Sequence, residues 1–296
     1  MEIIKLLRIK HWVKNLFLFI PVFFAGELFL KENWISLLWG FLAFSFIASA
    51  VYIINDFRDI ENDRLHPVKK DRPLASGRVS LITASILFVV LSLLSLITAY
   101  FLHTSFFIVI IIYFVLNLSY TFGLKNVSIL DILIVASGFL LRTIAGAQIT
   151  EVLVSQWLII MVFLLAVFLA LAKRRDDILI NENSGIVLRK SSQHYNLDFV
   201  NSCLTMLSAV IIVAYIMYTI SDEVTERLNS EYVYITSIFV VAGVIRYLQI
   251  TLVENNSGSP TKILYSDPFI RITLLGWIIS FYIIIYLHKL NYHLQF

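Results

Sequence analysis

The chain has 296 residues, of which 59% are hydrophobic and 15% charged, with a formal net charge of +3 and a mean hydropathy of +0.85. A soluble domain has about 45–50% apolar and about 25% charged residues, and a globule of this length has no interior large enough for the excess. The composition therefore excludes a water-soluble protein and assigns most of the surface to lipid. The one cysteine, Cys203, excludes a disulfide within the chain and a CxxC metal site.

A bilayer core of about 30 Å requires about 20 mostly apolar residues in a helix, and about nine segments approach that length. In chain order they are Asn15–Leu30, Trp34–Ile54, Val79–Leu102, Ser105–Phe122, Ile129–Ile149, Trp157–Leu171, Phe199–Ile220, Tyr232–Leu248 and Ile270–Leu287. The first is the weakest, because Pro21 and Glu27 interrupt it, and a kinked or re-entrant segment is the alternative to a full span there. The sequence thus predicts an all-α polytopic membrane protein, with residues 1–296 forming one transmembrane domain.

Basic residues are distributed unevenly between the two sides of these predicted spans. Nineteen Lys and Arg fall in the N-terminal segment and in every second connection, three fall on the other side, and Arg142 lies inside the fifth span. Because positively charged connections stay in the cytoplasm, this distribution predicts a cytoplasmic N-terminus and cytoplasmic basic connections in an inner or plasma membrane.

The second predicted span ends in an acidic segment that includes Asn55, Asp56, Asp59 and Asp63. If the helix continues, the three aspartates stand at i, i+3 and i+7, and their carboxylates share one face. Such like charges repel one another, and Mg²⁺ is the natural counter-ion, because it takes oxygen ligands and is shared between carboxylates and substrate phosphates. The alternative is a solvated helix end that neighbouring arginines neutralise. Because ionisable groups beside a span are functional by default, we favour metal ligands.

A basic segment with Pro and Gly, residues 66–78, follows at once. Lys69, Lys70 and Arg72 in this segment are candidate phosphate ligands, since ammonium and guanidinium groups are common partners of phosphate.

A second group of polar residues surrounds the fifth predicted span. It consists of Tyr120 and Lys125 before the span, Asp131 at its start, and Gly138, Arg142 and Gly146 along it. Asp131 and Arg142 are eleven residues apart, about three turns, and so lie near the same face. Arg142 either forms a structural ion pair or binds an anion. Asp131 is a candidate ligand for a second metal, and the two glycines allow close helix packing.

Two further basic clusters lie at the ends of predicted spans. Lys173, Arg174 and Arg175 end the sixth span, where they either set the topology or bind phosphate. Lys14 stands beside Trp12 at the entrance of the first span and is a further candidate phosphate ligand, whereas Trp12 is expected to be an interfacial anchor.

The pattern Asn55-Asp56-x-x-Asp59-x-x-x-Asp63 resembles the first aspartate-rich motif of the UbiA superfamily of intramembrane prenyltransferases. Other segments extend the resemblance along nearly the whole chain, and it is closest to the decaprenyl-phosphate phosphoribosyltransferase branch. These segments are Trp12-Val13-Lys14-Asn15, residues 55–77, Leu124-Lys125 with Leu130-Asp131, Gly138-Phe139-Leu140-Leu141-Arg142, residues 169–175, and Arg246-Tyr247-Leu248 with Ser266-Asp267-Pro268.

The resemblance implies nine helices around a central cavity open to the cytoplasm. It also implies Mg²⁺ on the first aspartates, a diphosphate donor held by metal and basic residues, and a polyprenyl chain in a lipid-open tunnel. Most aromatic prenyltransferases of the superfamily have a second pair of aspartates, whereas only Asp131 is at hand here. This departure favours a donor whose phosphates are held partly by cations of the protein.

The resulting hypothesis is a Mg²⁺-dependent transfer of 5-phosphoribose from phosphoribosyl diphosphate to a polyprenyl phosphate in the bilayer, with no nucleic-acid partner. Asp56, Asp59 and Asp63 are expected to be catalytic and, with Asn55 and Asp131, to bind the metal. The expected phosphate ligands are Lys14, Lys69, Lys70, Arg72, Tyr120, Lys125, Arg142 and Lys173.

Three alternatives stand beside this hypothesis. The first is transfer of a polyprenyl group from its diphosphate to an aromatic acceptor. The others belong to different classes, a membrane transporter and a non-catalytic binding protein. Transport is disfavoured because the charges cluster at one membrane face rather than at the midplane of several spans.

Overall fold

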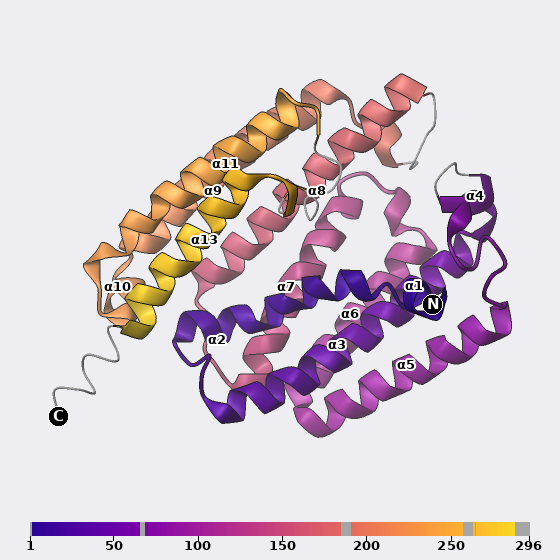
Figure 1. Ribbon diagram of the computed structural model, residues 1–296, viewed down its shortest axis with the longest axis horizontal. Helices are drawn as coiled ribbons and strands as arrows, with labels where there is room; N and C mark the ends of the chain where they lie inside the picture. The colour runs from indigo at the N-terminus through magenta and orange to yellow at the C-terminus, as the bar shows by residue number, and fades with distance from the viewer. Residues whose placement is uncertain (1, 66–68, 185–190, 257–262, 264, 288–296) are drawn as a thin grey trace. The chain divides into compact units, whose positions relative to one another are not determined.

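The computed structural model of the chain describes residues 2–65, 69–184, 191–256, 263 and 265–287. Every regular element within these residues is helical (Figure 1). An all-α fold was predicted from the apolar segments and is confirmed.

Eight helical segments in the described ranges are long and apolar enough to cross a membrane. They are α3 (Lys31–Arg58), α5 (Leu81–Leu102), α6 (Thr104–Phe122), α7 (Leu130–Thr150), most of α8 (Gln156–Ser184), α9 (Leu197–Ile220), η5 (Glu231–Thr236) with α11 (Ser237–Leu252), and α13 (Pro268–Tyr282) continued by η6 (Ile283–Leu287). These eight correspond to the second to ninth predicted spans. The short elements α1 (Glu2–Leu7), α4 (Ile60–Leu65), η2 (Lys69–Asp71), η3 (Leu124–Asn126), η4 (Ser191–His194) and α10 (Asp222–Leu228) flank or connect them.

The first predicted span has a different structure from the other eight. Its residues belong to a 3₁₀ helix, η1 (Ile9–Phe19), followed by α2 (Ile20–Ala25) and by Gly26 at a left-handed φ of 71°. Pro21 lies in the first turn of α2, where its missing N–H group has no helical partner to lose. The predicted interruption therefore occurs, as a change of helix type, and the total of nine spans stays a prediction.

The chain divides into two compact units. The first contains residues 1–125 and 137–154, and the second contains residues 126–136 and 155–296, so that the boundary passes through α7. That residues 1–296 act as one domain stays a prediction.

The core of the first unit surrounds α3, which packs against η1, α5 and α6. Phe44 and Ile47 of α3 and Phe106 of α6 are fully buried there. Close approach of η1 to α7 depends on Gly146, since a Cβ atom at that position would lie 1.9 Å from the carbonyl oxygen of Leu18. The close packing expected at Gly146 is therefore present.

A smaller apolar cluster in the same unit anchors the connection between α4 and α5. Leu74 and Val79 of that connection are buried together with Leu6, Ile53 and Leu91. This cluster fixes the backbone from which the basic residues of the connection project.

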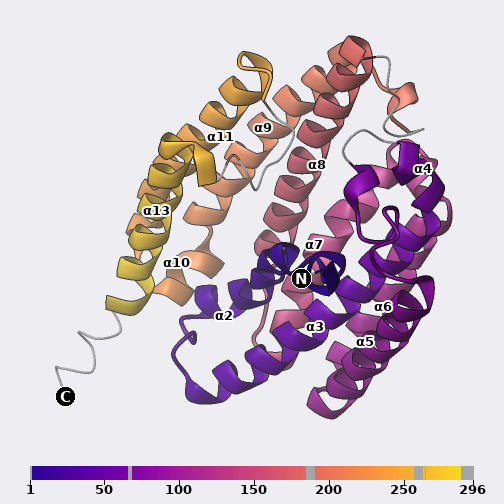
Figure 2. The same ribbon diagram turned by 45° about the vertical axis from the view of Figure 1, so that its right-hand side comes forward.

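The core of the second unit is formed by α8, α9 and α11, with α13 against α11. Figure 2 shows α9, α11 and α13 lying side by side. The rings of Phe168 and Tyr247 join α8 to α11 at a centroid distance of 5.4 Å.

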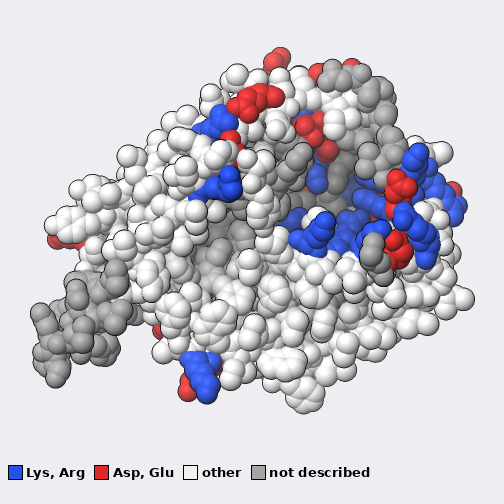
Figure 3. All heavy atoms as spheres, in the orientation of Figure 1, with Lys and Arg blue, Asp and Glu red and all other residues white. Residues whose placement is uncertain are grey.

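The outer faces of the spans are apolar. Ile82 and Phe101 at the two ends of α5 are largely exposed, while its buried face is made of small residues such as Ser95 and Ala99. Figure 3 shows charged side chains gathered in a few places on the visible face, with mostly uncharged surface between them. A surface of this kind is stable in lipid, which confirms the prediction of an integral membrane protein.

Candidate active site

The candidate site lies in the first unit, where α3 ends. The helix stops at Arg58, and Asp59 leaves helical geometry with φ −98° and ψ 7° before α4 begins at Ile60. Helical hydrogen bonding nevertheless crosses the break, because the N–H of Asp59 donates to the carbonyl of Asn55 at 3.1 Å and that of Asp63 donates to Asp59 at 2.8 Å. The acidic residues therefore keep a nearly helical spacing around one irregular residue.

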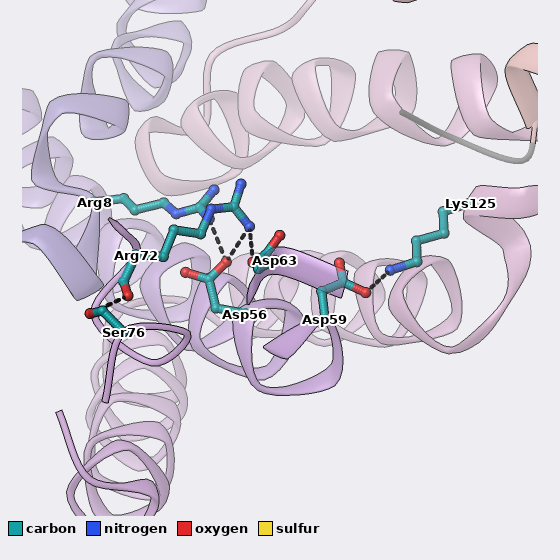
Figure 4. Close-up of polar contacts among 7 residues, drawn as sticks. All are labelled: Arg8, Asp56, Asp59, Asp63, Arg72, Ser76 and Lys125. Atoms are coloured by element: carbon teal, nitrogen blue, oxygen red, sulfur yellow. Dashed lines mark hydrogen bonds and ion pairs between the residues drawn. The ribbon is translucent and has the colours of Figure 1, made fainter. Parts of the chain in front are cut away.

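Two of the three aspartates converge on a single cation. Arg72 Nη1 lies 3.0 Å from Asp56 Oδ1 and 2.6 Å from Asp63 Oδ2, and Arg8 also forms an ion pair with Asp56 (Figure 4). Asp56 and Asp63 are only 2% and 3% exposed. Two buried carboxylates thus face one point that a positive charge occupies.

Asp59 belongs to a separate ion pair. Its Oδ1 atom accepts a hydrogen bond from Lys125 Nζ at 2.6 Å, away from Asp56 and Asp63 (Figure 4). The expectation that all three carboxylates share one face therefore holds only for Asp56 and Asp63, because the non-helical backbone of Asp59 directs its own side chain toward η3. Asn55 is half-buried one turn before Asp59.

The residues present fit a Mg²⁺ ion bound with a substrate. Within the described ranges, no three His, Cys, Asp or Glu side chains form a group that could hold a metal. Mg²⁺, however, is usually held by one or two carboxylates together with water and substrate phosphates. Asp56 and Asp63 meet this requirement, because one oxygen from each lies within 3.0 Å of the same atom.

The basic connection is held in place by its own backbone. Arg64 Nε donates to the carbonyl of Ala75 at 3.2 Å, and the hydroxyl of Ser76 donates to the carbonyl of Arg72 at 2.7 Å. Of the predicted ligands here, Arg72 reaches the aspartates, Lys69 is half-buried and Lys70 is exposed. Residues 66–68, which begin the predicted phosphate segment, lie outside the described residues.

Arg142 is 5% exposed in the middle of α7, where aromatic rings and neutral acceptors surround it. Its guanidinium donates to Asn15 Oδ1 at 2.7 Å, to the Gly138 carbonyl at 2.6 Å and to the Tyr113 hydroxyl at 3.0 Å. Its Cζ atom is 5.0 Å from the centre of the Phe44 ring. Its hydrogen-bond acceptors among the described residues are all neutral, so the structural ion pair, one of the two alternatives, is not found there, and anion binding stays a prediction.

Lys14 lies near this guanidinium. Its Nζ atom is 5.9 Å from the centre of the Phe139 ring, and Phe139 also packs beside Arg142. Burial and the nearby charges of Arg142 and Arg8 lower the pKa of Lys14 to about 8. An anion bound here would restore the charged form of the lysine.

Trp12 has a defined partner as well. Its indole N–H donates to the hydroxyl of Ser49 at 3.0 Å, which ties η1 to α3. The residue is half-buried, and its role as an interfacial anchor stays a prediction.

Asp131 belongs to a buried network in the second unit. Its carboxylate accepts from Arg174 at 2.5 Å, from Ser191 at 3.0 Å and from Tyr195 at 3.1 Å, and Arg174 also pairs with Asp177 at 2.8 Å. Burial raises the pKa of Tyr195 to about 12, so its hydroxyl remains a donor at neutral pH. Asp131 thus has Arg174 as its charged partner, and its role as a metal ligand stays a prediction.

The remaining predicted ligands lie on other helices. Tyr120 is half-buried on α6, and Lys173 is exposed on α8, and their roles as phosphate ligands stay predictions. Arg175 is buried and donates to Asn201 and Asn255, both at 2.8 Å.

Arg8 is a site residue that no motif in the sequence identifies. It lies between α1 and η1 at a left-handed φ of 51° and reaches Asp56, which is 48 residues away in the chain. It is one of several basic residues near the N-terminus, and no local spacing distinguishes it from the others.

The chain is similar in sequence to known proteins and in fold to solved structures. The UbiA prenyltransferase family matches residues 18–248. A decaprenyl-phosphate phosphoribosyltransferase of Mycolicibacterium smegmatis is 32% identical over 93% of this chain and 90% of its own length. One of Corynebacterium glutamicum is 32% identical over 96% of this chain and 86% of its own length. The solved structure of a UbiA homolog from Archaeoglobus fulgidus bound to GPP and Mg²⁺ has a TM-score of 0.71 and 21% identity, covering 96% of this chain and 99% of that one.

Proposed function

Because the chain belongs to the UbiA prenyltransferase family of membrane-embedded enzymes, we propose that it transfers 5-phosphoribose from phosphoribosyl diphosphate to a polyprenyl phosphate. Diphosphate is the second product. The names of the two bacterial relatives support transfer of a phosphoribosyl group to a decaprenyl-type acceptor, since both alignments cover most of both chains.

One observation carries the proposal of a diphosphate donor. Asp56 and Asp63 direct buried carboxylates at one point, with Arg72 and Arg8 beside them and Lys125 on the neighbouring Asp59. Alternating negative and positive groups of this kind suit a magnesium diphosphate, because the carboxylates hold the metal and the cations hold the phosphate oxygens.

The proposed reaction is a single displacement at the anomeric carbon. The bond from C1 to the diphosphate oxygen breaks with its electron pair leaving on diphosphate, while an oxygen of the lipid phosphate forms a new bond to C1. Bound Mg²⁺ would neutralise the charge that develops on the leaving group. Asp56 and Asp63 would hold the metal, and Arg72 and Lys125 would stabilise the negative charge on the phosphate oxygens of the leaving group.

The lipid phosphate is already ionised near neutral pH, so the chain needs no strong base. The protein contributes by holding the two substrates in line for the displacement, which removes much of the entropic cost of bringing them together. The proposed phosphate ligands remain Lys14, Lys69, Lys70, Arg72, Tyr120, Lys125, Arg142 and Lys173. Among these, Arg72 and Lys125 are the candidates for the diphosphate, because they already contact the aspartates.

The orientation in the membrane is part of the proposal. The excess of Lys and Arg on one side supports a cytoplasmic N-terminus and a cytoplasmic opening of the site. A polyanionic sugar donor is water-soluble and would reach the aspartates from that side.

The proposal can be tested by a transfer assay on the purified full-length chain in lipid-containing detergent. Labelled phosphoribosyl diphosphate and polyprenyl phosphate would be supplied with Mg²⁺ or with EDTA. The variants Asp63→Asn and Asp56→Asn would be compared with Asp71→Asn, an exposed acid of the same connection. We expect Mg²⁺-dependent label in the lipid phase, a loss of at least 100-fold in the first two variants, on the order expected for charge-stabilising groups, and little change in the third.

Two results would contradict the proposal. A product that retains the configuration of the donor at C1 would exclude a single displacement. Absence of transfer, together with prenylation of an aromatic acid from a prenyl diphosphate, would move the function to the aromatic prenyltransferases.

A further inference from the structure

A cavity of the first unit lies beside the candidate active site. A cavity of about 340 Å³ is formed between the end of α3, α4, the connection that follows and the start of α5. Its wall combines apolar side chains, among them Phe57, Leu74 and Leu81, with Arg58, Arg64 and Glu61.

The position of this cavity coincides with the ends of two membrane spans. The α3 span ends at Arg58 and the α5 span begins at Leu81, and both residues line the cavity. Phe57 and Leu81 are also substantially exposed. The cavity therefore lies at the boundary between apolar surface and water, where phospholipid headgroups are found.

The cavity is set apart from the aspartate site by helical geometry. Phe57, Arg58, Glu61 and Arg64 follow one another at the spacing of one helix face. Asp56 precedes this set and faces Arg72 instead. The two groups of side chains thus occupy different sides of α3 and α4.

Three features of the cavity favour an anion. Arg58 is exposed and makes no hydrogen bond or ion pair within the described part of the chain. Arg64 pairs with Glu61 at 3.1 Å and retains further N–H donors. The 22-residue helix α5 begins here with Ser80 as its N-cap, so its first free N–H groups and positive dipole end lie at the same cavity.

We propose that this cavity binds the phosphate headgroup of an anionic phospholipid, with Arg58 as its principal ligand. Basic pockets between spans on the cytoplasmic side are recognised sites for such headgroups. The apolar wall from Phe57 to Leu81 provides the surface along which the first part of an acyl chain would lie.

Binding there would also affect the aspartate site. The cavity is lined by Leu74 and Gly77, and the same short connection holds Arg72 against Asp56 and Asp63. A headgroup bound in the cavity would restrict the motion of this connection and would thereby hold Arg72 in its contact with the aspartates. Anionic lipid would then act as an ordering ligand for the diphosphate site.

The test is a binding measurement that needs no transferase activity. Fluorescent phosphatidylglycerol would be titrated into the purified full-length chain in neutral detergent, with fluorescent phosphatidylcholine as the zwitterionic comparison. The variants are Arg58→Gln and the double variant Arg58→Gln/Arg64→Gln. Arg271→Gln is the matched control, because Arg271 is an exposed arginine at the start of α13 and outside the cavity.

We expect phosphatidylglycerol to bind about fivefold more weakly to Arg58→Gln and about 30-fold more weakly to the double variant, since each basic group near a lipid headgroup adds about 1 kcal/mol. Arg271→Gln should bind as the unmodified chain does. Equal binding to Arg58→Gln, or equal binding of phosphatidylcholine, would overturn the proposal. Displacement of the lipid by millimolar inorganic phosphate would also overturn it, because the cavity would then be a site for soluble phosphate.

Discussion

Replacing Arg72 with glutamine tests whether the carboxylates it joins are held together by charge. In the native chain its Nη1 atom lies 3.0 Å from Asp56 and 2.6 Å from Asp63. Without it, Asp63 loses its ion pair, while Asp56 keeps Arg8. Two buried negative groups would then face each other with one cation in place of two.

The size of the effect follows from burial. Removing one partner of a buried ion pair costs about 3–5 kcal/mol, because the remaining charge is left unpaired. The Arg72 side chain is 25% exposed and Asp56 keeps a second partner, so about 2–3 kcal/mol is expected here. Mg²⁺ would remove most of this loss, since it supplies the missing positive charge to the same oxygens.

Unfolding in mixed micelles, followed by circular dichroism as the denaturing detergent is increased, measures this free energy. The unmodified chain, Arg72→Gln, Asp63→Asn and the double variant would each be examined with EDTA and with Mg²⁺. The double variant should be less destabilised than the sum of the two single variants, because it lacks both members of the pair.

The reasoning would be refuted by either of two results. One is an Arg72→Gln variant as stable as the unmodified chain in EDTA. The other is an equal stabilisation of both proteins by Mg²⁺, which would mean that the arginine and the metal do not use the same carboxylate oxygens.

Three further predictions concern residues outside this pair. Gly146→Ala should lower the free energy of unfolding by about 1–3 kcal/mol in the same assay, because the new Cβ would lie 1.9 Å from the Leu18 carbonyl oxygen, and unchanged stability would contradict this close approach. Burial lowers the pKa of Lys14 from 10.5 to about 8, so between these pH values the lysine is protonated in the unfolded chain and neutral in the folded one. The free energy of unfolding should therefore rise with pH across that range, and Lys14→Met should abolish the rise. Asp131→Asn should cost about 2–4 kcal/mol of stability, since Arg174 loses one of the carboxylates that it pairs with among the described residues. Mn²⁺ affinity of the same variant, measured by electron paramagnetic resonance, separates the two roles of Asp131, because a lower affinity identifies a metal ligand and an unchanged affinity a structural acid.

The spans could be predicted because bilayer thickness imposes a length on any apolar helix. Eight of them follow the predicted segments, and α3 extends four residues beyond the predicted end at Ile54, which brings Asp56 into the helix. The first segment departs from an α-helix where Asn15 bonds to Arg142 and where Leu18 meets Gly146. Contacts between residues so far apart in the chain leave no local pattern.

Part of the site could be predicted because helical periodicity relates residues that are close in the sequence. Asp56 and Asp63 are seven residues apart, so helical periodicity places them on one face, and the basic segment that supplies Arg72 follows directly. The side chain of Asp59 points elsewhere because its own backbone is not helical, and no Gly or Pro in the sequence predicts a break at this position.

Partners from distant elements could not be identified in this way. Arg8 reaches Asp56 across 48 residues. Asp131 has a predicted neighbour on its own helix in Arg142, yet Arg174 on another helix supplies its ion pair. Periodicity selects a face of a helix, but the packing of other helices selects the partner.

The acceptors around Arg142 also bear on how the chain is made. An arginine near the centre of a span raises the free energy of insertion by about 2.5–3.5 kcal/mol. Asn15 and Tyr113, which accept its hydrogen bonds, both precede it in the sequence. Both residues are therefore already synthesised when α7 leaves the ribosome, so Arg142 can form these hydrogen bonds as α7 inserts into the bilayer. Replacing Asn15 with an apolar residue would thus reduce the fraction of chains in which α7 inserts, before any effect on the activity of the folded protein.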